Sequence, residues 1–307
     1  MQSTTFRALA STIFAAIDAD TAPALRALEA LEEKVDALEA RASRFRTDSE
    51  LVRLNARSGE RVRVSSELWQ EIATAVAMAR WTGGLVTPTV LPLLEHAGYD
   101  RTFDELADRV LDTPNRPAPP VCDARAIILH ANSSSVELPA HARLDLGGTA
   151  KGHAADVFAG ELGGMGPSLV DVGGDIAVSG PRADGTPWPI DVQDPHDPER
   201  SLALVALGSG GVATSGRDFR RWRTTNGEAH HIVDPRTGRP AHSDVIAATV
   251  VARSALRAEV AAKVVVLLGS RAGLDWLGAE PDLAALVVLE NAEVHTCPRF
   301  SGHLWSD

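Results

Sequence analysis

The stretch LDLGGTAKGHAADVF, residues 144–158, places an acid, two glycines and a lysine where an apolar run changes into a helical pattern. Leu144 and Leu146 alternate as at the end of a strand, and apolar residues recur at helical spacing from Ala150 onward. The N-terminus of a helix presents backbone N–H groups and a partial positive charge, and glycines let a ligand approach that backbone closely. The stretch therefore predicts a strand, a tight turn and a helix whose N-terminus can bind an anion.

Two alternatives stay open for this stretch when it is taken alone. It contains neither GxxxxGK[ST] nor GxGxxG, so it is not a P-loop or the dinucleotide-binding fingerprint. A strand-turn-helix with two glycines is also a common structural element without a ligand. The same holds for DVGGDIAVSG (171–180), which predicts a hairpin, and for His230 and His231, which are either acid/base groups or satisfied polar groups.

Composition and charge exclude several classes of protein. The 307 residues are 44% hydrophobic and 23% charged, as in ordinary globular proteins, and the formal net charge of -11 argues against a nucleic-acid-binding protein. The two cysteines form no CxxC pair, so no zinc or redox motif is expected. No run of about 18 apolar residues predicts a membrane span, and the first residues lack the basic flank of a signal peptide, so a cytoplasmic location is expected.

The periodicity predicts an α+β fold with a largely antiparallel sheet. Helices are expected over 21–43, with Thr21 as cap and Pro23 in the first turn, over 66–81 with Ser65 or Ser66 as cap, and near 150–163 and 254–268. Short apolar segments between tight turns predict strands near 126–130, 134–138, 142–147, 168–173, 175–180, 188–193, 201–207, 284–290 and 293–297. The proline-rich stretch 112–124 is expected to be a surface connection between two parts of the chain.

Four segments together resemble the FAD:protein FMN transferases, the ApbE family. They are SRFRTDSELVRLN (43–55), LDLGGTAKGHAAD (144–156), LVDVGGDIAVSG (169–180) and HHIVDPRTGRPA (230–241), and the resemblance runs from about residue 6 to the end. It implies one two-lobed domain over 1–307 that binds FAD between its lobes and uses Mg²⁺. The implied reaction cleaves the FAD pyrophosphate and joins FMN to a Ser or Thr hydroxyl of an acceptor protein. Some relatives instead hydrolyse FAD or merely bind it.

The resemblance also assigns roles to individual residues. It implies that His231 is the base for the acceptor hydroxyl or orients that hydroxyl, and that the backbone of Gly147 and Gly148 offers a carbonyl to Mg²⁺. The residues that it places against FAD are Leu9, Phe45, Thr87, Pro88, Thr89, Asp145, Lys151 and Ala241.

One helix departs from the family pattern. Where the family has an Asp and, four residues later, a Thr that both bind Mg²⁺, this chain has Glu259 and Lys263. A Glu can still bind Mg²⁺, whereas an ammonium has no lone pair to offer. Either Lys263 turns away and the metal is held by Glu259, phosphates and water, or its ammonium takes the place of the metal and contacts the pyrophosphate. The chain is therefore expected to be a flavin transferase or, alternatively, a FAD-binding protein with weak or no transferase activity.

Overall fold

The computed structural model describes residues 1–106, 110–112, 117–225 and 227–305, and it divides into two compact units. Unit 1 comprises residues 1–35, 151–218 and 243–307, and unit 2 comprises residues 36–150 and 219–242. Residues 113–116 of the proline-rich stretch lie outside the described residues, and the residues on both sides of them belong to unit 2.

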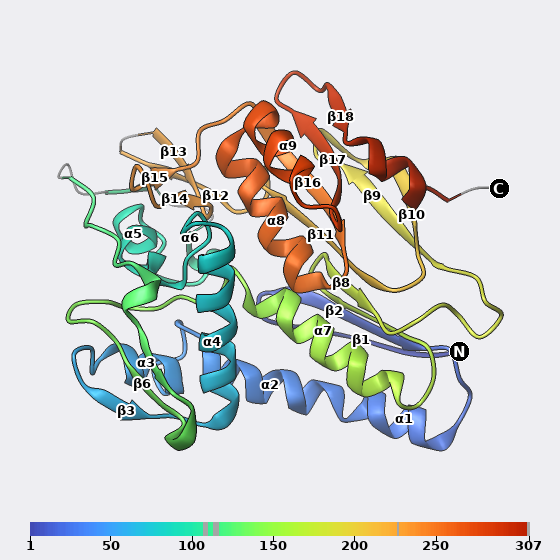
Figure 1. Ribbon diagram of the computed structural model, residues 1–307, viewed down its shortest axis with the longest axis horizontal. Helices are drawn as coiled ribbons and strands as arrows, with labels where there is room; N and C mark the ends of the chain where they lie inside the picture. The colour runs from blue at the N-terminus through green and yellow to red at the C-terminus, as the bar shows by residue number, and fades with distance from the viewer. Residues whose placement is uncertain (107–109, 113–116, 226, 306–307) are drawn as a thin grey trace. The chain divides into compact units, whose positions relative to one another are not determined.

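Unit 1 is built on one sheet in which every neighbouring pair of strands is antiparallel (Figure 1). The strand order is β1-β2-β7-β8-β11-β16-β17-β18. Their bounds are β1 Gln2–Ala8, β2 Ser11–Ile17, β7 Ser168–Val172, β8 Asp175–Val178, β11 Gly210–Gly216, β16 Val245–Ala252, β17 Ala284–Leu289 and β18 Val294–Thr296. The successive hairpins follow from tight turns, of which Gly173 and Gly174 form one with φ of 64° and 92°.

Helices and a second, two-stranded sheet complete unit 1. The helices are α1 Ala22–Glu29, α7 Ala150–Gly163, α8 Ala255–Leu268, α9 Ser270–Gly278 and the 3-10 helix Pro298–His303. Helix α8 packs along β11 and β16 (Figure 1), where a Cβ on Gly211 would lie 2.2 Å from the backbone nitrogen of Ala255. The hairpin of β9 Trp188–Asp194 and β10 Asp197–Leu207 shares an apolar core with β7, β8, β11, β16 and β17.

Unit 2 is mainly helical and has small sheets. Its helices are the later part of α2 Leu31–Ala42, α3 Glu50–Asn55, α4 Ser66–Trp81, α5 Leu91–His96, α6 Phe103–Leu106 and the 3-10 segments Pro88–Val90, Ala124–Ala126 and Ala131–Ser133. Its strands are β3 Arg61–Arg63, β4 Val110–Leu111, β5 Ile128–His130, β6 Ser135–Glu137, β12 Arg221–Thr224, β13 Gly227–His230, β14 Val233–Asp234 and β15 Arg239–Pro240. Among the described residues of unit 2, one apolar cluster surrounds α4 and another surrounds α5 and Trp222.

The structure confirms the fold class and most of the predicted helices. The helix over 66–81 is present with Ser65 as its cap, and those near 150–163 and 254–268 begin and end within one residue of the prediction. The helix predicted over 21–43 is wrong in one respect, because Ala30 interrupts it between α1 and α2. Thr21 caps α1 as expected. No described helix is long and apolar enough to cross a membrane.

The strand predicted over 142–147 is wrong. The segment is extended but pairs with no strand, since its hydrogen bonds go to a side chain and a loop. Asn55 donates from Nδ2 to the carbonyl of Leu144 at 2.9 Å, and its Oδ1 accepts from the N–H of Leu144 at 2.8 Å. The N–H of Asp145 donates to the carbonyl of Pro88. The alternation of Leu144 and Leu146 reflects burial in the core of unit 2 rather than a place in a sheet.

Candidate functional site

Four charged side chains of unit 1 form one cluster, defined here as the four-charge cluster: Lys151, Asp175, Glu259 and Lys263. Lys151, in the first turn of α7, pairs with Asp175 at the start of β8, Nζ to Oδ2 at 2.5 Å. One helical turn apart on α8, Lys263 pairs with Glu259, Nζ to Oε1 at 2.8 Å. Asp175 also interacts electrostatically with both Glu259 and Lys263, so the two pairs act on each other.

In the four-charge cluster the two acidic side chains are more deeply buried than the two lysine side chains. The side chains of Glu259 and Asp175 are 0% and 1% exposed, whereas those of Lys263 and Lys151 are 15% and 21% exposed. This arrangement differs from a solvated Lys–Glu pair on a helix surface, which contributes little. The exposed part of the four-charge cluster therefore belongs to its lysine side chains, and its acidic side chains are buried.

Glu259 also caps the N-terminus of α7. Its Oε2 accepts from the backbone N–H of Gly152 at 2.9 Å, one of the N–H groups in a first helical turn that have no partner within their own helix. A Cβ on Gly152 would lie 2.8 Å from that Oε2 and equally close to the backbone of α8, so glycine allows the approach. Asp156, one turn further along α7, in turn accepts from the N–H groups of Ala255 and Leu256. The two helices thus satisfy each other's N-termini with carboxylates.

Burial governs the ionisation of Asp175. The pKa of Asp175 is raised to about 6, mainly because the carboxyl is removed from water. The Lys151 ammonium opposes this rise, the Glu259 carboxylate adds to it, and Lys263 opposes it. Burial also raises the pKa of Asp156, against the two backbone N–H groups that favour its charged form. A carboxyl that takes up a proton near neutral pH therefore lies beneath the two lysines.

The described residues do not fit a divalent metal ion at Glu259. Mg²⁺ requires oxygen ligands with available lone pairs. Oε1 of Glu259 faces the Lys263 ammonium, Oε2 accepts from Gly152, and an ammonium cannot be a ligand. In the part of the chain that the structure describes, no group of three or more His, Cys, Asp or Glu side chains could hold a metal.

In unit 2, Asp145 is held by an arginine that the sequence analysis did not single out. Arg44 Nε lies 2.6 Å from Asp145 Oδ2, and the N–H of Gly147 donates to Oδ1 at 2.8 Å. The guanidinium of Arg44 also stacks over Phe45 and Tyr99, 4.0 and 4.4 Å from the ring centroids. Its Nη2 is buried without a hydrogen-bond partner among the described residues, beside a Phe45 side chain that is 37% exposed.

The Thr87-Pro88-Thr89 loop supports Asp145 from the other side. The Thr89 hydroxyl donates to the carbonyl of Cys122 at 2.6 Å, so the hydroxyl of Thr87 is the donor in the 2.7 Å bond between the two threonines. The carbonyl of Pro88 accepts from the N–H of Asp145 at 2.8 Å. All three loop residues are buried, and their polar groups organise unit 2 internally.

The two adjacent histidines have different surroundings. His230 is buried, its Nδ1 accepts from the N–H of Ile232, and its Nε2 therefore carries the proton and donates to the carbonyl of Ala241. This makes His230 a structural residue that fixes Ala241. His231 is partly exposed, and its N–H donates to the carbonyl of Arg220, whose side chain reaches Tyr99. Of the two histidines, His231 is thus the more exposed.

Leu9 lies in a strained turn of unit 1. Leu9 and Ala10 join β1 to β2 as a two-residue hairpin loop, and both have positive φ, 53° and 50°. Such loops favour Asn and Gly, because a Cβ makes the left-handed conformation unfavourable. Strain of this kind persists where the surrounding structure enforces it and is frequent at functional sites.

Several of the sequence-predicted residues meet within one unit, whereas Leu9 lies in the β1–β2 loop and Ala241 is bonded to His230. Lys151, Glu259 and Lys263 meet in unit 1, whereas Phe45, Asp145 and the loop 87–89 meet in unit 2. Arg44, Gly152 and Asp175 were missed as members of these groups. Each lies inside a quoted motif or one residue from a predicted site, but its partner is distant in sequence.

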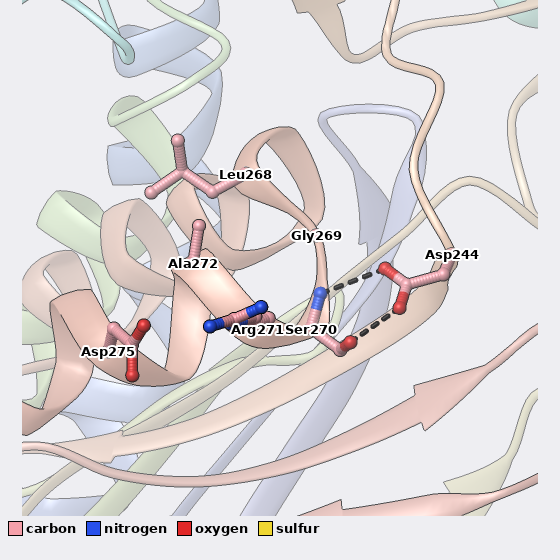
Figure 2. A pocket seen from close by; sticks show the side chains of 7 residues that line it. All are labelled: Asp244, Leu268, Gly269, Ser270, Arg271, Ala272 and Asp275. Atoms are coloured by element: carbon pink, nitrogen blue, oxygen red, sulfur yellow. Dashed lines mark hydrogen bonds between the residues drawn. The ribbon is translucent and has the colours of Figure 1, made fainter.

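A hollow of about 280 Å³ in unit 1 is separate from these groups (Figure 2). Asp244 bonds to the N–H and hydroxyl of Ser270 there, at the start of α9. The lining residues are Asp244, Leu268, Gly269, Ser270, Arg271, Ala272 and Asp275, and none is a sequence-predicted site residue.

Comparison with known proteins gives one consistent result. A family model described as the ApbE family matches residues 5–287. A FAD:protein FMN transferase of Treponema pallidum is 30% identical over 89% of this chain and 80% of its own length. A FAD:protein FMN transferase of Vibrio cholerae is 30% identical over 76% of this chain and 70% of its own length. The solved structure of the ApbE protein of Thermotoga maritima superposes with a TM-score of 0.85 at 26% identity, covering 99% of each chain. The chain belongs to the ApbE family.

Proposed function

We propose that this chain transfers FMN from FAD to a Ser or Thr hydroxyl of an acceptor protein. The observation that carries the proposal is the pair of ammonium groups, Lys151 and Lys263, above buried carboxylates in a chain whose relatives are named FAD:protein FMN transferase. The acceptor oxygen forms a bond to the phosphorus of the FMN half. The bond from that phosphorus to the bridging oxygen breaks, AMP leaves with the electron pair, and the hydroxyl proton passes to a base.

Negative charge on the pyrophosphate is the main obstacle to this step, so fixed positive charge is the main contribution that a protein can make. We assign this role to Lys151 and Lys263. Their positions are fixed by ion pairs before the ligand arrives, so little side-chain entropy is lost on binding.

The ring systems of FAD require flat and apolar contacts. We assign these contacts to Phe45, Leu9, Ala241 and the loop 87–89, and a hydrogen bond to a ring acceptor to Nη2 of Arg44. The support is the exposed ring of Phe45 and the buried Nη2 atom that lacks a partner among the described residues. Asp145 acts here by positioning Arg44, since both of its oxygens have partners within unit 2.

We assign the base to His231. A histidine is protonated and deprotonated near neutral pH and can accept the hydroxyl proton. Its partial exposure, in contrast to the buried and doubly bonded His230, supports this choice. The assignment of the Gly148 backbone carbonyl to Mg²⁺ stays a prediction, which the resemblance to the family implies and which Mg²⁺ binding by a Gly148 variant would test.

The test is transfer by purified protein to an acceptor protein that one of the named relatives modifies. We expect flavin fluorescence on the acceptor in a denaturing gel, with AMP released in equal amount. His231→Asn should lower the rate by about 10² to 10⁴, while His295→Asn, at an exposed histidine, should leave it unchanged. No flavin on the acceptor with folded protein would contradict the transferase proposal.

A second candidate function is FAD binding without transfer. The observation that favours it is that both Glu259 oxygens already have partners. The positive charge then comes from two separate lysine ammonium groups, whereas Mg²⁺ would place a charge of +2 at a single point. The same experiment separates the candidates, because tight FAD binding with no AMP release and no labelled acceptor would support the binding protein.

We also propose that the reaction takes place in the cytoplasm. The support is that Cys122 and Cys297 are both unpaired, as is usual in reducing compartments. Fractionation of the native cells tests this, and recovery of the protein outside the cytoplasmic fraction would contradict it.

A further inference from the structure

We propose that Lys263 acts as a built-in cation in place of a divalent metal, so that this chain binds the diphosphate of a flavin nucleotide without Mg²⁺. The inference rests on the proposed function for the identity of the ligand. In the four-charge cluster of unit 1, each carboxylate is paired with a lysine, so no metal is needed to balance the charges.

The carboxylate that would bind a metal is already paired with a cation. The Lys263 ammonium lies 2.8 Å from Oε1 of Glu259, and the Gly152 N–H donates to Oε2 at 2.9 Å. Oδ2 of Asp175 is taken by Lys151 at 2.5 Å. A divalent ion at Glu259 would have to displace an ammonium from a fully buried carboxylate, and removing one partner of such a pair is strongly unfavourable.

The acidic side chains of the four-charge cluster lie deeper than the basic ones. Glu259 and Asp175 are almost fully buried, whereas the side chains of Lys263 and Lys151 are partly exposed, so an approaching ion meets the lysine side chains first. Such a surface repels a metal cation and attracts an anion. An ammonium has three N–H donors, so Lys263 can donate to a phosphate oxygen while it stays paired with Glu259.

Lysine is rare in this chain, and two of its lysines lie in the four-charge cluster. Of its 30 basic residues only three are lysine, Lys34, Lys151 and Lys263, and the remainder are arginine. Two of these three lie in the four-charge cluster. An ammonium is a compact, strongly hydrated point charge, whereas a guanidinium is broad and planar, so lysine is the better substitute for a small cation.

Lys34 provides a matched control. It pairs with Glu161 in unit 1, and both side chains are about half exposed. Neither residue belongs to the four-charge cluster. An exposed pair of this kind contributes little to stability, because solvent screens the two charges. Replacement of Lys34 thus removes a lysine and an ion pair without touching the proposed site.

The first experiment measures Mn²⁺ binding to ligand-free protein by the loss of the free-ion signal in electron paramagnetic resonance. We expect the wild type and Lys34→Met to leave the signal undiminished. Lys263→Thr opens Oε1 of Glu259 and adds a hydroxyl oxygen, so it should bind Mn²⁺ at least about tenfold more tightly than the wild type. Stoichiometric Mn²⁺ binding by the wild type would overturn the inference, as would a Lys263→Thr protein that binds no more than the wild type.

The second experiment measures FAD affinity from flavin fluorescence, in Mg²⁺ and in EDTA. The double variant Glu259→Gln, Lys263→Met removes both charges together, so no unpaired charge is buried and the Gln oxygen can still accept from Gly152. We expect equal wild-type affinity in both buffers, and a loss of about tenfold to a hundredfold in the double variant, as for a lost charge-assisted hydrogen bond. Lys34→Met should match the wild type.

The outcomes separate failure of this inference from failure of the proposed function. Wild-type affinity that falls about tenfold or more in EDTA would overturn metal independence while FAD binding itself stands. A wild type that binds no FAD in either buffer would contradict the proposed function, and the Mn²⁺ measurement would still decide whether Lys263 excludes a metal.

Discussion

The backbone N–H of Gly152 donates to Oε2 of Glu259 at 2.9 Å, although 107 residues separate the two in sequence. The bond joins the first turn of α7 to the middle of α8 inside unit 1. It is possible because position 152 has no side chain, and it fixes the carboxylate with which Lys263 pairs. Much of the electrostatics of the four-charge cluster therefore depends on one absent methyl group.

Gly152→Ala should destabilise the protein by about 1 to 3 kcal/mol, because its Cβ would lie 2.8 Å from backbone atoms of α8 as well as from Glu259. The better helix propensity of alanine, about 0.5 to 1 kcal/mol, offsets only part of this cost. Gly160→Ala, in the same helix with open space around the new Cβ, should instead stabilise by that smaller amount. Urea unfolding measures both, and equal stability of the two variants would contradict the close approach.

Local sequence signals were sufficient where an element satisfies its own backbone. The cap Ser65 and the apolar stripe of α4 lie within a few residues of each other, and both were predicted. The same holds for the hairpin of β17 and β18. Helices with local caps and hairpins with tight turns are enough to indicate the α+β class, although the order of the strands in the sheet is not local.

The sequence failed where a partner comes from a distant segment. Leu144 alternates like a strand residue, but its hydrogen bonds go to Asn55, 89 positions earlier. The bond from the Gly152 N–H at the start of α7 to Glu259 was likewise not predicted, because 107 residues separate the two. Arg44 was missed because its partners, Asp145 and Tyr99, are brought to it by the tertiary structure.

Ala10→Gly should stabilise the protein by about 0.5 to 1 kcal/mol. The residue has φ of 50° in the hairpin loop, and relief of this strain outweighs the greater entropy of glycine in the unfolded chain. Ala8→Gly, two residues earlier in β1, removes the same methyl group without strain to relieve and should destabilise by a similar amount. Thermal unfolding of both variants tests this, and effects of equal sign would refute the strain.

Asp175 should make stability depend on pH in a definite direction. Its pKa is raised to about 6 by burial, so the folded protein holds a proton that the unfolded chain has lost. The stability contributed by the neutral carboxyl is complete below about pH 4 and is lost as the pH rises through 6, up to about 3 kcal/mol. Asp175→Asn stays neutral, so its stability relative to the wild type should increase between pH 4 and 7.

The control for this pH profile is Asp184, an exposed residue whose pKa is lowered by hydrogen bonds from the hydroxyl and the N–H of Thr186. Here the charged form is favoured in the folded state, so Asp184→Asn should lose stability relative to the wild type as the pH rises. Unfolding by urea at several pH values gives both differences. A flat profile for Asp175→Asn would mean that Asp175 stays ionised in the folded protein.

Asn55→Ala should destabilise the protein by about 2 to 4 kcal/mol, because it leaves both the N–H and the carbonyl of buried Leu144 without a partner. Asn55→Asp can still accept from the N–H but cannot donate to the carbonyl, so its cost should also be large. Asn291→Ala, at an exposed turn, should change stability by less than about 0.5 kcal/mol.

Because Asp145 follows Leu144 and holds Arg44, we expect FAD affinity to fall with Asn55→Ala even below its unfolding temperature. Thermal unfolding and FAD titration on the same samples measure both effects, and a destabilised variant with full affinity would show that Leu144 does not position Asp145.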